Sequence, residues 1–145
     1  MNKEQYLEVL RQMVSFAVDY QYKYDSTNEY EPAFFAVLLY VSNAEPELRR
    51  EAELEFVRKL NQAGSHIHEL MCYCMPELQF PLVKETVIGL LNSEKDLRRI
   101  SVLSDVLESY DYKKEDLDDF YSYYRNKSEL HTPAIAPEVP EKNKR

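Results

Sequence analysis

Residues 80–124 read FPLVKETVIGLLNSEKDLRRISVLSDVLESYDYKKEDLDDFYSYY, a pattern that predicts three consecutive helices. Pro81 suits a first helical position, because the amide hydrogen that proline lacks has no helical partner there. Ser93 is expected to cap the next helix, with Asp96 answering it as a capping box. Each helix carries apolar residues at the i, i+3, i+4, i+7 spacing of one buried face. These residues are Leu82, Val83, Val87, Leu90 and Leu91; Leu97, Ile100, Leu103, Val106, Leu107 and Tyr110; and Leu117, Phe120, Tyr121 and Tyr124.

The links between these segments are short, and helices joined by two or three residues must lie roughly antiparallel. Burying one large apolar side chain is worth ~1.5–3 kcal/mol. Ordering the backbone costs ~1–2 kcal/mol for every residue, so one apolar face does not stabilise a helix on its own. The sequence therefore predicts helices that pack on one another.

The N-terminal part of the chain begins with two more predicted helices. Asn2 is expected to cap a first helix over Lys3–Tyr24, with Gln5 completing a capping box. Pro32 is predicted to start a second helix, which is almost wholly apolar from Ala33 to Val41. A helix that is apolar all round is typically buried, so this segment is expected at the centre of the N-terminal half.

Two further helices are predicted before residue 80. Pro46 begins the third, and Gly64 follows its end as a C′ residue. Charged residues of both signs surround the apolar side of this helix, a pattern typical of a solvent-exposed face. These residues are Arg49, Arg50, Glu51, Glu53, Glu55, Arg58 and Lys59. Ser65 is expected to cap the fourth helix, and Pro76 is expected to stop it.

The predicted fold class is all-α, with about seven helices stacked as antiparallel hairpins in a HEAT-like arrangement or packed as an irregular bundle. Self-similarity hints at stacking, because Leu-Arg-Arg follows an acid at Glu47–Arg50 and again at Asp96–Arg99. Residues 1–127 are expected to form a single domain. Residues 128–145 contain three prolines and almost no apolar period, which predicts a disordered tail.

The charge of the chain is acidic and unevenly distributed. The 145 residues carry a formal net charge of −8, and residues 128–145 contribute none of it. Asp105–Asp119 holds seven acids against Lys113 and Lys114. A concentrated negative field repels nucleic acid and attracts basic partners. The alternative is a solvated surface that only keeps the protein soluble.

Composition also limits the compartment and the chemistry. Cys72 and Cys74 would point in different directions on a helix, so we expect no disulfide and a reducing, cytoplasmic location. No apolar run is long enough to span a membrane. With only 2 Gly in the chain, no glycine-rich loop is present to cradle a phosphate.

Metal and catalytic sites find little support in the sequence. His68 and Cys72 lie four residues apart and share a helix face, and zinc accepts both side chains. Two more ligands would have to come from elsewhere, since His66 and Cys74 point in other directions. Carboxylates on one helix normally need partners from a second helix to bind a metal. We therefore expect no metal, no cofactor and no enzymatic activity.

Three segments carry a resemblance to a known group of proteins. They read ELMCYCMPELQFPLV at residues 69–83, DLRRISVLSDVLESYD at residues 96–111 and EDLDDFYSYYR at residues 115–125. In their helix starts, paired arginines and acidic, aromatic last helix, residues 69–125 resemble bacterial HEAT-like helical-repeat proteins. The resemblance implies a binding scaffold with no known catalytic set, so it assigns no functional residue. The residues before Glu69 lie outside it.

Tyrosines accompany the acids near the C-terminal end of the helical region. The chain has 12 Tyr and no Trp, and tyrosine is a favoured interface anchor. Tyr112 and Tyr123 lie off the buried faces and are expected to be exposed, although tyrosines that simply cover a helical edge are the alternative. The residues predicted to bind a partner are Asp105, Glu108, Asp111, Tyr112, Glu115, Asp116, Asp118, Asp119 and Tyr123.

The sequence therefore predicts a non-enzymatic module that binds another protein, a basic one, and neither nucleic acid nor a membrane. In the leading hypothesis it is an immunity or inhibitor protein that neutralises a basic toxin or enzyme. Small bacterial immunity proteins are similar in charge, size and helicity. The alternative is a structural adaptor in a larger assembly. Salt-sensitive binding would favour the inhibitor, whereas an exposed apolar patch would favour the adaptor.

Overall fold

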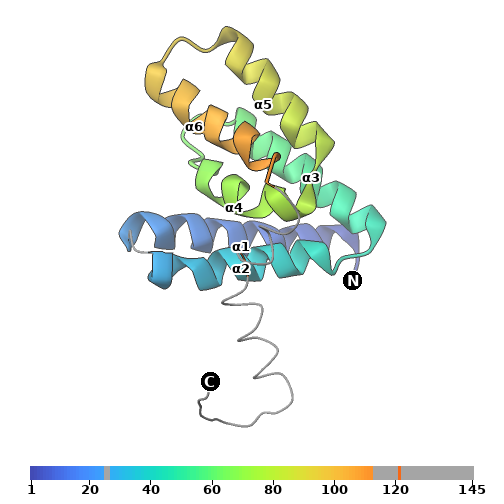
Figure 1. Cartoon of the computed structure of the whole chain (residues 1–145). Coiled ribbons are helices and arrows are strands. Elements are labelled where there is room, and N and C mark those ends of the chain that lie inside the picture. Colours follow the sequence, from blue (N-terminus) through green and yellow to red (C-terminus); the bar gives the residue numbers. More distant parts are fainter. Residues whose placement is uncertain (25–26, 113–120, 122–145) are drawn as a thin grey trace. The chain divides into compact units, whose positions relative to one another are not determined.

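The computed structural model describes residues 1–24, 27–112 and 121 (Figure 1). This part of the chain contains six α-helices and no strand, so the predicted all-α class is confirmed. The helices are α1 (Lys3–Lys23), α2 (Thr27–Ser42), α3 (Pro46–Asn61), α4 (His68–Leu78), α5 (Pro81–Ser93) and α6 (Leu97–Ser109). The predicted seventh helix and the predicted tail lie outside the described residues, apart from Tyr121, which is helical and buried.

Three predicted helix starts are confirmed. The Asn2 side chain accepts a hydrogen bond from the Gln5 amide at 2.8 Å, and the Gln5 side chain accepts one from the Asn2 amide at 3.2 Å. These two bonds form a complete capping box at the start of α1. Pro46 and Pro81 open α3 and α5, where proline gives up no helical hydrogen bond.

Pro32 lies inside α2 and not at its start, so that prediction is wrong. The helix begins at Thr27, and the proline removes the one helical hydrogen bond that its missing N–H would have made. A tertiary contact stabilises the first turns, because the Glu31 carboxylate accepts a hydrogen bond of 3.1 Å from the Tyr73 hydroxyl on α4. Packing therefore outweighs the local signal.

Pro76 likewise lies inside α4, which it was predicted to stop. Met75, Pro76 and Leu78 are all buried, so packing stabilises the last turn. The helix ends at Leu78 and is capped by Gln79, whose backbone adopts the left-handed conformation with φ of 51°. Its side-chain amide donates to the carbonyls of Pro76 and Tyr110, both at 3.2 Å, and so satisfies a carbonyl at the helix end.

The link between α5 and α6 differs from the predicted capping box. Ser93 is the last residue of α5. Asp96 caps α6 instead, its carboxylate accepting the Arg98 amide at 3.0 Å, while the Glu94 carboxylate accepts the Asp96 amide at 3.2 Å. The apolar pattern predicts Leu97 as buried, but its side chain is 80% exposed. Leu97 is the first residue of α6, so it precedes the turns of the helix that pack against the core.

The six helices belong to one unit, Met1–Tyr112. In Figure 1, α1 and α2 lie side by side, and α5 and α6 form a second pair. Between these pairs, α3 packs on α1 and α5, and α4 packs on α2 and α6. None of the described helices combines the length and the apolar character needed to cross a bilayer.

Two glutamates of α3 are buried, which corrects the prediction of a solvent-exposed charged face. Glu53 accepts the Leu82 amide at 2.7 Å, in the first turn of α5. Glu55 pairs with Arg11 of α1 at 3.2 Å and with Arg58 at 2.6 Å. Buried carboxylates are tolerated when their oxygens are paired, and each of these carboxylates ties α3 to another helix.

Candidate functional site

The described part of the predicted acidic face lies on α6 and just after it. Asp105 and Glu108 are exposed on the helix, and Asp111 and Tyr112 are exposed beyond its end. The three carboxylates form no ion pair with any residue in the described part of the chain, so no basic side chain there neutralises them. The other predicted partner-binding residues lie outside the described residues. They are Glu115, Asp116, Asp118, Asp119 and Tyr123.

One side of α2 is exposed, although the sequence pattern predicts the whole helix as buried. Phe34, Leu38 and Val41 point into the core. The opposite side, the outer face of α2, contains no charged residue and follows the helical spacing of three or four. It consists of Pro32, Ala36, Leu39, Tyr40 and Asn43. Leu39 is 38% exposed, so the composition of this helix fits a more buried position than the one it occupies.

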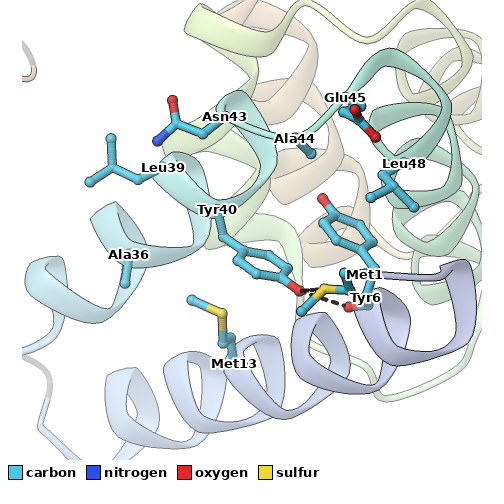
Figure 2. A pocket seen from close by; sticks show the side chains of 10 residues that line it. All are labelled: Met1, Tyr6, Met13, Ala36, Leu39, Tyr40, Asn43, Ala44, Glu45 and Leu48. Atoms are coloured by element: carbon cyan, nitrogen blue, oxygen red, sulfur yellow. Dashed lines mark hydrogen bonds between the residues drawn. The ribbon is translucent and has the colours of Figure 1, made fainter.

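A groove of about 700 Å³ lies beside the outer face of α2, between α2 and α1 (Figure 2). The Tyr40 ring stacks on the Tyr6 ring, with centroids 4.7 Å apart and 10° between the ring planes. The Tyr40 hydroxyl donates to the Tyr6 carbonyl at 3.2 Å. Met1, Met13 and Leu48 line the groove around the two rings. The groove is therefore a mostly apolar site with an aromatic pair inside it.

The Tyr6 hydroxyl is a buried polar group with no hydrogen-bond partner among the described residues. Tyr6 is 2% exposed, and its hydroxyl points toward the α2–α3 connection near Ala44 and Glu45 (Figure 2). Burial and the neighbouring Tyr40 raise the pKa of Tyr6 to about 12, against the opposing charge of Arg49. The hydroxyl is therefore neutral at physiological pH and available both to donate and to accept.

Acidic residues flank the outer face of α2 at both ends. Glu29 is exposed in the first turn of α2, and Glu45 follows the helix and lines the groove. An adjoining cleft of about 430 Å³ is lined by Glu45, Glu47 and Glu51, with Lys3 beside them. The uncharged face therefore ends in negative charge on either side.

The histidines and cysteines considered as metal ligands lie in separate environments. No group of three or more His, Cys, Asp and Glu side chains is placed to hold a metal ion within the described ranges. His66, just before α4, forms a hydrogen bond of 2.5 Å with the Tyr22 hydroxyl. Burial lowers the pKa of His68. Burial raises the pKa of Cys72 to about 12 and also raises that of Cys74, so both thiols are protonated at neutral pH.

Comparison with known proteins finds no match: no protein family, curated protein or solved structure is similar enough to this chain to be aligned with it. The resemblance of residues 69–125 to HEAT-like proteins therefore stays a prediction. The structure itself offers two candidate surfaces, the acidic side of α6 and the outer face of α2 with its groove. The second was missed as a site because the apolar run from Ala33 to Val41 predicts a helix that is buried on all sides.

Proposed function

We propose that this chain is a non-enzymatic protein-binding module and that a partner protein covers the outer face of α2. The observation that carries the proposal is the exposure of an uncharged helix side. Leu39 is 38% exposed within a run of thirteen residues, Pro32–Ala44, that contains no charge. A helix that is apolar all round normally has all its sides covered, and exposed apolar patches mark interaction sites.

The exposed patch favours the structural-adaptor form of this proposal. In stacked helical repeats each unit buries its sides against neighbours, and the terminal unit needs a polar outer face. If the helices of this chain stack as HEAT-like hairpins, the outer face of α2, unlike the exposed side of α1, lacks the charged residues of a terminal cap. A further element from another protein would then continue the stack. The proposed setting is the reducing cytoplasm, where the free thiols Cys72 and Cys74 would stay reduced.

A second form of the proposal is an immunity or inhibitor protein that binds a basic toxin or enzyme through the acidic face. The exposed carboxylates of Asp105, Glu108 and Asp111, which lack ion pairs with other described residues, favour it. An unneutralised negative surface speeds association with a basic protein. In this form, binding weakens as salt rises.

A pull-down from the native cell lysate, eluted in steps of rising salt, tests both forms. Leu39→Glu places a charge on the outer face of α2. Ile88→Glu is its matched control, because Ile88 on α5 is 40% exposed, close to the value for Leu39. Asp105→Asn combined with Glu108→Gln weakens the acidic face. Circular dichroism verifies that every variant is folded before the comparison is made.

The two forms of the proposal differ in which variants should lose the bound partner. An adaptor partner elutes at higher salt than the partner of an inhibitor, because apolar contacts hold it, and it is lost only with Leu39→Glu. A basic partner of an inhibitor leaves at moderate salt and is lost only with the neutralised acids. The proposal is overturned if no protein binds, or if the proteins that bind do so equally to all variants.

A further inference from the structure

We infer that the outer face of α2 and the adjoining groove receive an amphipathic helix of a partner protein, one that carries lysine or arginine at both of its ends. The inference rests on the proposed protein-binding function and adds the shape and charge of the partner. Its grounds are the juxtaposition of an uncharged helix face, an apolar groove and two acidic ends.

The outer face has the shape of a helix-binding surface. From Pro32 to Asn43 it covers about 16 Å at 1.5 Å per residue, or roughly three helical turns. Ala36 lies near its middle and, being small, allows another backbone to approach closely. Met13 on α1 and Leu39 on α2 line the groove from different helices. Grooves between two helices bind a third through anchors at i, i+3, i+4 and i+7.

The groove also offers an anchor site for a large apolar side chain. Met1, Met13 and Leu48 surround the stacked rings of Tyr6 and Tyr40 (Figure 2). Methionine side chains adapt their shape to what they contact. The Tyr6 ring is 2% exposed and its hydroxyl is buried, so a partner would contact the apolar lining of the groove.

The charges around the face specify a basic partner. Glu29 lies at the start of α2 and Glu45 just after its end, both exposed. Neither forms an ion pair with a residue that the structure describes. Glu47 and Glu51 add to the negative charge near Glu45, and Lys3 beside them offsets one of these three charges. A helix lying along the face would therefore be attracted through basic residues at its two ends, since complementary charges steer and orient binding.

The same charges argue against a second copy of this chain as the occupant. Antiparallel pairing of two α2 helices would place Glu29 of one chain beside Glu45 of the other. Parallel pairing would place each glutamate beside its own counterpart. Both arrangements bring like charges together, between chains that each carry a net charge of −8. Like-charge contacts at an interface disfavour binding.

Two synthetic helical peptides test the inference against the full chain by fluorescence anisotropy. Both carry leucine and alanine at i, i+3, i+4 and i+7. One has lysines at both ends and the other has glutamates there. We expect the lysine peptide to bind about tenfold more tightly, because several rim charge contacts change sign together. Glu29→Gln combined with Glu45→Gln should reduce that ratio, Leu39→Glu should weaken both peptides, and Ile88→Glu should change neither.

Other results overturn the inference. If the two peptides bind equally, or the glutamate peptide binds more tightly, the partner is not basic. If neither peptide binds, the groove does not receive a helix of this kind. The lysate pull-down uses no peptide, so it still decides the proposed function separately. Sedimentation that shows the full chain as a dimer, dissociated by Leu39→Glu but not by Ile88→Glu, would replace the partner helix with a second copy.

Discussion

Tyr6 and Tyr110 are both buried tyrosines, and they differ in what their hydroxyl groups contact. The Tyr110 hydroxyl donates to the Phe80 carbonyl at 2.7 Å. The Tyr6 hydroxyl has no partner in the described part of the chain. Replacing either residue by phenylalanine keeps the ring and removes only the hydroxyl. We therefore expect Tyr6→Phe and Tyr110→Phe to change the free energy of unfolding in opposite directions.

The magnitudes follow from the hydrogen bonding of each group. Burying a polar group without a partner costs ~1–3 kcal/mol, so Tyr6→Phe should raise the free energy of unfolding by up to about that amount. Tyr110→Phe removes a hydrogen bond worth ~0.5–1.5 kcal/mol. The Phe80 carbonyl keeps its bond from the Lys84 amide at 3.3 Å, so this loss should lie near the lower end of the range.

Urea unfolding followed by circular dichroism measures both changes on the full chain. The slope of the free energy against urea should be the same for wild type and variants, because the ring still packs and the exposed area on unfolding is unchanged. A loss of ~1 kcal/mol or more for Tyr6→Phe would refute the reasoning, since it matches the removal of a satisfied hydrogen bond. The groove would then lose its unmet polar group.

Three further predictions concern other buried or half-buried groups. Glu55→Gln should lower the free energy of unfolding by about 1–3 kcal/mol at neutral pH, because it breaks a buried ion pair whose arginines are partly exposed. Burial alone would raise the pKa of Glu55, but hydrogen bonds from its two arginine partners bring it below 4.5. This contribution to stability is present above the ordinary glutamate pKa and is lost in acid. The free energies of unfolding of wild type and variant should therefore converge at acidic pH; a difference that is constant with pH would contradict this. Half-buried Cys72, whose pKa is raised to about 12, and buried Cys74 should alkylate slowly at neutral pH and rapidly in urea, as mass spectrometry would show; rapid native labelling of Cys74 would contradict its burial. Leu39→Lys should change stability by less than about 1 kcal/mol, whereas Leu38→Lys should unfold the protein because it buries a charge; a thermal melt compares them, and equal losses would contradict the assignment of faces.

Local sequence rules predicted three helix starts at which the deciding atoms are close in sequence. Asn2 caps α1 through residues of the same turn, and Pro46 and Pro81 fit first positions without any distant contact. Pro32 and Pro76 do not mark helix ends, because contacts from other helices stabilise the turns around them. The sequence holds no local trace of those contacts, so the boundaries it predicts there are wrong.

The prediction that the charged side of α3 is solvent-exposed is wrong for a related reason. Alternating charge is typical of an exposed helix side, yet Glu53 and Glu55 are buried. Glu53 pairs with the Leu82 amide, and Glu55 pairs with Arg11 as well as with the local Arg58. Both Leu82 and Arg11 are far away in the sequence. By contrast, helical spacing alone separates the buried Leu103 from the acids on the opposite side of α6.

The two neighbouring leucines of α2 support the proposed partner at the outer face. Leu38 is 1% exposed and belongs to the core, whereas Leu39 is 38% exposed and points to the other side. A lysine at position 39 would keep its aliphatic stem on the helix surface and its charge in water, so the fold of the isolated chain does not require leucine there. Solubility would favour the charged residue. An apolar side chain that the fold does not need, beside a mostly apolar groove, is accounted for by the proposed partner that covers this face.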